Sequence, residues 1–208
     1  MEVVKCLTPE AKKNSLVLSH IHKEYRSKVV IKDFSYTFKK GHVYLLTDGN
    51  GYGKSTLIKI ICGLIKGEGD VNFYEHHISY IPEKINLPSL MNSDDFLECL
   101  GEIKGIKEQE CHRRILELTQ FFDFNEGLHK PMKALSKGMR QKVFLIGAFL
   151  REEEIYIFDE PLNGLDEQAV HQFLTLIQEY KKRNATFIIV THEAGVYAGL
   201  YDDIIHLD

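Results

Sequence analysis

The feature that most constrains the fold is a glycine-rich turn at residues 45–56, with the sequence LLTDGNGYGKST. An apolar run leads into it, and residues 57–61 continue as the start of a helix. Glycines let backbone N–H groups approach oxyanions closely, and a helix N-terminus adds unpaired N–H groups and the positive end of its dipole. Lys54 is expected to reach the outer phosphates of a ligand, and the Ser55 hydroxyl to ligate Mg²⁺. The sequence therefore predicts an α/β fold built around a phosphate site.

Asp48 departs from the strict phosphate-loop pattern GxxxxGK[ST], which has its first glycine at this position. A carboxylate about 5 Å from a phosphate would cost about 3 kcal/mol at an effective dielectric of about 20, so we expect Asp48 to point away. For this stretch alone, an ordinary glycine-rich turn before a helix is the alternative.

Composition favours one α/β domain without a metal or disulfide framework. The 208 residues and 44% hydrophobic content suffice for a core, and the net charge of −4 argues against a broad nucleic-acid surface. The four cysteines are scattered without a C-x-x-C pair, which indicates reduced thiols. No third ligand stands at useful spacing from the His20/His22 or His76/His77 pairs, so we expect no zinc site.

The sequence contains no run that approaches the roughly 20 apolar residues of a membrane span. The longest apolar run, residues 143–150, has eight residues, and the first residues lack the apolar core of a secretion signal. We therefore expect a cytoplasmic chain that is at most peripheral at the inner face of the membrane. Any role in the membrane needs a separate partner chain.

Periodicity predicts a mixed sheet flanked by helices. The expected strands are residues 16–21, 29–38, 43–46, 71–74, 78–81, 154–160, 185–190 and 203–207. Residues 84–135 have helical periodicity instead, with a helix cap at Ser93 followed by acidic first-turn residues. The expected architecture is a single domain, 1–208. Its α/β core with an antiparallel β portion comprises 16–83 and 136–208, and 84–135 is an inserted helical subdomain.

Three polar side chains are expected at the carboxyl edge of the sheet, where ligands bind in open α/β folds. Asp159 and Glu160 end an apolar strand, and His192 ends another. Asp159 is placed to hold Mg²⁺ through water, and Glu160 to polarise an attacking water. His192 could hydrogen-bond a terminal phosphate. The alternatives are a solvated strand end for the two acids and a structural role for the histidine.

Two further positions have open interpretations. Ser136 is expected to cap a helix that carries Gly138 in its first turn, an unfavourable residue there unless something approaches the backbone. An ordinary capped helix is the alternative. Tyr25 is expected in the first turn, either as an exposed aromatic that stacks on a purine or as a cover for the edge of the hairpin. Asp166 follows a tight turn and is expected to cap the helix at 167–182.

The order of these motifs resembles the nucleotide-binding domains of ATP-binding cassette (ABC) ATPases. Residues 50–56 (NGYGKST) look like the Walker A motif, and Glu83 in YIPE falls at the Q-loop. Residues 135–141 (LSKGMRQ) are similar to the signature motif, 155–160 to Walker B, and 162–166 to the D-loop. His192 matches the switch histidine, and Tyr25 falls where the family stacks adenine on an aromatic. The resemblance covers nearly the whole chain from residue 16.

The resemblance implies ATP hydrolysis in a head-to-tail dimer. The nucleotide-binding residues it implies are Tyr25, Asn50, Gly51, Tyr52, Gly53, Lys54, Ser55 and Thr56. The metal ligands are Ser55, Glu83 and Asp159, and the catalytic residues are Glu160 and His192. The D-loop residue is Asp166. The segment that contacts the ATP of the partner copy, which is an identical or a paralogous subunit, is Ser136, Lys137, Gly138 and Met139.

Several residues depart from the family pattern, and they affect what we expect of ATP turnover and of the direction of transport. Tyr52 stands where the family usually has a small residue, and Glu83 replaces the usual glutamine. Lys137 and Met139 give the signature a form that resembles ATPases serving export-type membrane partners. The apolar residues 85–91 could dock a cytoplasmic helix of such a partner.

Three functions stay open on the sequence. The first is the energy-supplying subunit of a membrane exporter with separate membrane chains. The second is a soluble ABC ATPase acting on ribosomes or nucleic acid, against which stand the single cassette, the short insertion and the negative charge. The third is a non-hydrolysing regulatory or immunity module, which Asp48 and Tyr52 would favour. The first agrees best with the presence of Glu160 and His192.

Overall fold

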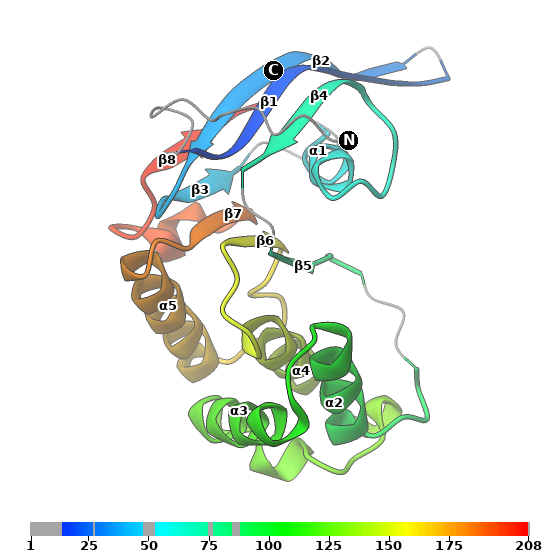
Figure 1. The fold of residues 1–208 in the computed structure, drawn as a ribbon, viewed down its shortest axis with the longest axis vertical. Helices are drawn as coiled ribbons and strands as arrows, with labels where there is room; N and C mark the ends of the chain where they lie inside the picture. Colours follow the sequence, from blue (N-terminus) through cyan, green and yellow to red (C-terminus); the bar gives the residue numbers. More distant parts are fainter. Residues whose placement is uncertain (1–13, 27, 48–52, 75–76, 85–87, 208) are drawn as a thin grey trace.

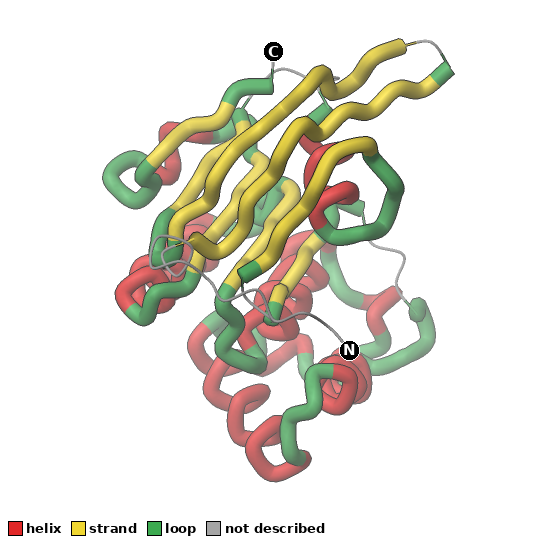
Figure 2. The backbone as a smooth tube through the Cα atoms, turned by 45° about the horizontal axis from the view of Figure 1, so that its top comes forward, coloured by secondary structure: helices red, strands yellow, loops and turns green. Residues whose placement is uncertain are grey.

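The fold is described by a computed structural model for residues 14–26, 28–47, 53–74, 77–84 and 88–207. Two sheets and a group of helices make up the described chain (Figure 1). Figure 2 shows the strands gathered toward one end of the molecule and most helices toward the other.

A five-stranded parallel sheet forms the centre of the fold. Its order is β5 (Ile78–Ile81), β6 (Ile155–Asp159), β7 (Thr186–Val190), β3 (Val43–Leu46) and β8 (Asp203–Ile205). Every residue of β3, β6 and β7 is buried, because both faces of the sheet are covered. This explains why these strands appear in the sequence as unbroken apolar runs.

A three-stranded antiparallel sheet in the order β2 (Lys28–Lys39), β1 (Asn14–Tyr25) and β4 (Glu68–Phe73) confirms the predicted antiparallel portion. Its inner residues share one core with α1 (Lys54–Ile61) and with β3, β6 and β7. The expectation for Tyr25 is corrected: it is the last residue of β1 and pairs with Lys28. The strand extends beyond its apolar run because backbone pairing continues to the hairpin tip.

The helices cover the other face of the parallel sheet. They are α2 (Ser93–Ile103), α3 (Glu108–Phe121), α4 (Lys137–Phe149) and α5 (Glu167–Lys182), with 3₁₀ turns at Asn125–Gly127, Met132–Ala134 and Ala194–Tyr197. Leu97, Ile115 and Phe122 belong to the same core cluster as Phe149 and Phe158. The predicted insertion therefore packs onto the sheet through α4, and its boundaries at 84 and 135 stay a prediction.

The expected cap at Ser93 is wrong. Asn92 is the N-cap of α2, whereas Ser93 is fully buried and its hydroxyl donates to the carbonyl of Gly127 at 2.7 Å. A long-range partner uses the hydroxyl, which a local pattern cannot reveal. Ser136 and Asp166 do cap their helices, through the N–H of Met139 at 3.1 Å and of Ala169 at 2.7 Å.

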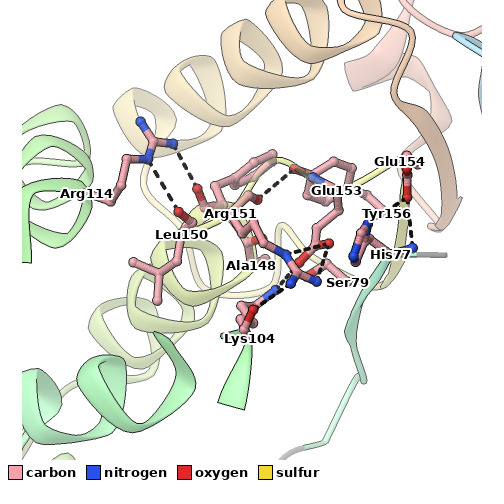
Figure 3. A network of polar contacts seen from close by, with 11 residues as sticks. His77, Ser79, Lys104, Arg114, Ala148, Leu150, Arg151, Glu153, Glu154 and Tyr156 are labelled. Carbon is pink, nitrogen blue, oxygen red and sulfur yellow. Dashed lines mark hydrogen bonds and ion pairs between the residues drawn. The ribbon is translucent and has the colours of Figure 1, made fainter. Parts of the chain in front are cut away.

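A buried ionic cluster joins the helices to the start of β6 (Figure 3). The side chain of Glu153 has no exposed surface, and its carboxylate accepts from Lys104 Nζ at 2.6 Å and from Arg151 Nη2 at 3.0 Å. Arg151 also donates to the carbonyl of Lys104 at the end of α2. On α3, Arg114 donates to the carbonyl of Phe149 at 2.9 Å. Polar contacts thus hold α2 against the segment that precedes β6, and α3 against the end of α4.

Candidate functional site

Three neighbouring strands end at the same level of the parallel sheet. Val190 pairs with Leu46 on one side and with Asp159 on the other. The N–H of Thr191 donates to the carbonyl of Leu46 at 3.1 Å, and the N–H of Glu160 donates to that of Val190 at 3.0 Å. The residues after β3, β6 and β7 therefore meet at one carboxyl edge, as the strand order of an open sheet requires.

The end of the phosphate loop is closely packed where α1 begins. Gly53 has φ +90°, and a Cβ on it would lie 2.7 Å from the carbonyl oxygen of Val30 in β2. This position therefore excludes any side chain, and the backbone turns directly into the buried Lys54. Because its N-cap is glycine, no N-cap side chain occupies the first-turn N–H groups of α1. Asp48, Asn50, Gly51 and Tyr52 lie outside the described residues.

Asp159 is a carboxylate that the fold has almost removed from water. It is 3% exposed, and burial raises its pKa. A hydrogen bond from the Ser55 side chain opposes this effect, whereas the charge of Glu83 adds to it. The positive charges of Lys59 and Lys54 lower the pKa again. A hydroxyl and two carboxylates thus converge beside α1.

Glu160 and His192 face each other at the ends of β6 and β7. Glu160 Oε1 lies 3.3 Å from His192 Nε2, and this buried oxygen makes no hydrogen bond within the described residues. Burial raises the pKa of Glu160, and His192 opposes the rise. Glu160 also has φ +53°, an uncommon value for a residue with a side chain. The end of β6 therefore places Glu160, a carboxylate with a raised pKa, in the site through a strained backbone conformation.

These groups line one cavity of about 470 Å³, here called the carboxyl-edge cavity. The predicted residues that line it are Gly53, Lys54, Ser55, Thr56, Glu83, Asp159, Glu160 and His192. Its described walls carry lysine, hydroxyl, carboxylate and imidazole groups, which suit a charged ligand rather than an apolar one.

The other predicted site residues lie elsewhere. Tyr25 is 46% exposed at the hairpin tip, where Lys23 Nζ lies 5.0 Å from its ring centroid. Residues 136–139 form the capped first turn of α4 and do not line the carboxyl-edge cavity. Asp166 caps α5, and its carboxylate lies 3.1 Å from Lys142 Nζ. In a single chain, the signature-like turn is therefore not part of the cavity that residues 53–56 line.

Comparisons with known proteins agree with this arrangement. The ABC transporter family model matches residues 31–163. The chain is 34% identical over 79% of its length to the uncharacterized ABC transporter ATP-binding protein YthP of Bacillus subtilis (strain 168), covering 70% of that protein. It is 33% identical over 81% of its length to the ABC-type transporter ATP-binding protein EcsA of the same organism, covering 73% of it.

A solved structure of an ATP-binding subunit of an ABC transporter superposes with a TM-score of 0.87 at 30% identity, over 93% of this chain and 85% of that one. The chain belongs to the ABC transporter ATP-binding family. It is an ATP-binding subunit of ATP-driven transport, and this family consists of ATPases. No helix in the described part of the chain is long and apolar enough to cross a membrane.

The donor set of this ABC ATP-binding protein fits a nucleotide-bound Mg²⁺. Mg²⁺ in such sites takes one or two carboxylates, and phosphate and water oxygens complete its shell. Asp159, Ser55 and Glu83 supply hard oxygen donors next to Lys54. Among the described residues, no three His, Cys, Asp or Glu side chains form a metal cluster.

Sequence reasoning missed four residues of the carboxyl-edge cavity: Val30, Asn163, Val190 and Glu193. Val30 comes from β2, and its approach to Gly53 has no signal in local spacing. Asn163 and Glu193 had a usable signal, since each is a polar residue just beyond a strand that ends at the site. The N–H of Glu193 donates to the Thr191 hydroxyl at 3.0 Å, which fixes the start of this segment.

Proposed function

We propose that this ABC ATP-binding protein hydrolyses Mg²⁺-bound ATP in the carboxyl-edge cavity, as a head-to-tail dimer that drives a membrane exporter. One observation carries the proposal. A lysine, a hydroxyl, a buried carboxylate, a basic carboxylate and an imidazole, drawn from three adjacent strand ends and α1, line a single cavity.

Each side chain has a role that follows from its surroundings. Glu160 takes a proton from the attacking water, since burial raises its pKa and its Oε1 accepts no hydrogen bond from the part of the chain that the structure describes. His192, 3.3 Å away, orients the carboxylate and hydrogen-bonds the γ-phosphate. Lys54 offsets phosphate charge. Mg²⁺, held by Ser55, Asp159 and Glu83, supplies further neutralisation of the phosphates when bound.

The head-to-tail dimer is supported by the position of the first turn of α4, which is not part of the cavity in its own chain. The first turn of α4 presents a capped helix N-terminus, a feature that binds anions. It does not line the cavity of its own chain, so any nucleotide it contacts belongs to a second copy. Ser136, Lys137, Gly138 and Met139 would then close the site of that copy, and Asn50, Gly51, Tyr52 and Thr56 would hold the nucleotide within its own chain. Tyr25 would stack on the adenine.

The membrane partner is proposed to insert a cytoplasmic amphipathic helix between the sheet edge and the helices. A groove of about 350 Å³ lies there, lined mainly by apolar residues of β5, α2 and α4. Ile103 at this groove is 81% exposed, and Leu90 in the predicted docking stretch is 76% exposed. Residues 85–87 of that stretch lie outside the described chain. Docking there would keep the protein on the cytoplasmic face of the membrane.

The partner proposal predicts that Ile103→Glu abolishes co-purification with a polytopic membrane chain from detergent extracts. Leu116→Glu is the matched control, because Leu116 is 63% exposed on α3 and does not line the groove. Equal recovery of the membrane chain with both variants would contradict the proposed surface. Stimulation of ATP turnover by ribosomes or nucleic acid, without any membrane chain, would favour the soluble alternative.

ATP turnover by purified variants tests the catalytic proposal. We expect Glu160→Gln to lower kcat by a factor of about 10²–10³ while ATP still binds, because the base is lost and the phosphate contacts stay. Glu193→Gln removes a carboxylate from the same cavity and should stay within about threefold of wild type. Full turnover by Glu160→Gln would remove Glu160 as the base, and absent ATP binding in wild type would favour the non-hydrolysing alternative.

A further inference from the structure

Gln141 in the second turn of α4 reaches the loop that follows the catalytic strand. Its side-chain Nε2 donates to the carbonyl oxygen of Pro161 at 2.9 Å. Pro161 is buried and directly follows Glu160. The amide of Gln141 is therefore one peptide unit away from the residue proposed as the base.

The backbone at Glu160 needs such support. A positive φ on a residue with a side chain is strained, and a following proline restricts the backbone further. The N–H of Glu160 donates to the carbonyl of Val190 at 3.0 Å, and its carbonyl accepts from the N–H of Asn163 at 3.3 Å. Proline has no N–H to contribute, so the carbonyl of Pro161 is the polar group through which this peptide can be held.

The same loop is fitted to α4 along its length. A Cβ on Gly138 would lie 2.3 Å from the carbonyl oxygen of Gly164. Farther along, Lys142 Nζ lies 3.1 Å from the carboxylate of Asp166. The first two turns of α4 and residues 161–166 thus pack as one unit. Within it, Gln141 makes the contact nearest to Glu160 in sequence.

We propose that Gln141 is a positioning residue that sets the direction of the Glu160 carboxylate through the carbonyl of Pro161. It thereby ties the base to the helix whose N-terminus carries Ser136. This inference rests on the proposed role of Glu160. On this proposal, the Glu160 carboxylate has its catalytic orientation only while α4 contacts residues 161–166.

The first test is Gln141→Met, which keeps an unbranched side chain of similar size and removes the amide. Misplacement of a reacting group by about 1 Å can cost 10²-fold in rate, so we expect kcat to fall about tenfold with KM for ATP within about twofold. Gln172→Met is the matched control. Gln172 also donates from a half-buried helix position to a backbone carbonyl. Its acceptor is Phe121, which is far in sequence from the proposed base. It should leave kcat unchanged.

A double-mutant cycle separates positioning from a merely structural role. In the Glu160→Gln background, Gln141→Met should cause no further loss of the residual rate, since the group it positions is gone. An equal further loss in that background would overturn the inference, as would wild-type kcat in Gln141→Met or a raised KM with unchanged kcat. If Gln141→Met fails to fold, Gln141→Glu gives the same comparison, because it keeps the length and lacks the amide donor. Full turnover by Glu160→Gln would instead refute the proposed function itself.

Discussion

Gly138 illustrates how a single residue can have two reasons for its identity. From sequence, a glycine in a first helical turn left two interpretations open, a backbone that a ligand approaches and an ordinary capped helix. The structure adds a reason within the chain, because a Cβ there would lie 2.3 Å from the carbonyl oxygen of Gly164. The residues next to Gly138 in the sequence do not reveal this second reason. It depends on the close approach of the Gly138 backbone to the backbone of Gly164, which lies 26 positions later in the chain.

Gly138→Ala should therefore destabilise the protein although alanine is the better helix former. The helical preference would add about 0.5–1 kcal/mol, whereas forcing a methyl group into a filled site costs typically about 1–3 kcal/mol. We expect a net loss of free energy of unfolding, measured by urea denaturation. Gly195→Ala is the control, since no atom of the described residues lies within 4 Å of its Cβ position. A Gly138→Ala variant as stable as this control would contradict the packing.

At the scale of elements, the buried cluster of Figure 3 joins α2 to the start of β6. Removing the charge of Glu153 leaves Lys104 and Arg151 without their shared carboxylate. Such a loss of one buried partner costs about 3–5 kcal/mol. We expect this loss of unfolding free energy for Glu153→Gln by urea denaturation.

Glu152→Gln is the matched control for the buried cluster. Glu152 pairs with Arg183, but its side chain is 62% exposed, and exposed pairs contribute at most about 1 kcal/mol. Similar losses of unfolding free energy in the two variants would show that the ion pairs of Glu153 stabilise the fold no more than an exposed pair does.

Asp202 connects β3 with α5 and gives the stability a pH dependence. It accepts from the N–H of Val43 at 2.7 Å and from Lys181 Nζ at 2.9 Å. Burial raises its pKa, but these hydrogen bonds and the charge of Lys181 prevail, so its pKa lies below the ordinary value of 3.8. A lowered pKa in the folded state means that the ionised group stabilises the fold above the unfolded pKa. This stability is lost as the pH falls through the folded pKa.

Asp202→Asn should thus reduce the unfolding free energy at pH 7 by about 1–3 kcal/mol, the contribution of hydrogen bonds to a charged group. The difference from wild type should shrink as the pH falls below about 4. Urea denaturation at several pH values measures both quantities. A difference that stays constant down to pH values of about 3 would contradict the assignment.

The elements that could be predicted are those whose burial produces a recognisable run of apolar residues in the sequence. The strands β3, β6 and β7 are apolar throughout because both faces are covered. The ends of β1 and β4 were missed because backbone pairing holds polar residues such as Glu24 and Glu68 in the antiparallel sheet. Ser93 was misassigned because its hydroxyl has a partner 34 positions away.

For the whole molecule, the order of motifs predicted which side chains meet, because the ends of parallel strands share an edge. Glu160 and His192 came together in this way across β6 and β7. The contact of α4 with residues 161–166 could not be predicted, since glycines and backbone carbonyls make most of it. That contact links the first turn of α4, which would contact the nucleotide of the partner copy, to the loop beside the base that would act on the nucleotide of its own chain.

The most direct test of the proposed dimer is the mass of Glu160→Gln in solution, measured by sedimentation with and without ATP and Mg²⁺. The variant keeps the phosphate contacts and lacks the base, so bound ATP should persist and hold two copies together. We predict the mass of one chain without nucleotide, twice that mass with ATP and Mg²⁺, and a return to one chain when EDTA removes the metal. A variant saturated with ATP that keeps the mass of one chain would contradict the proposal that two copies enclose the nucleotide.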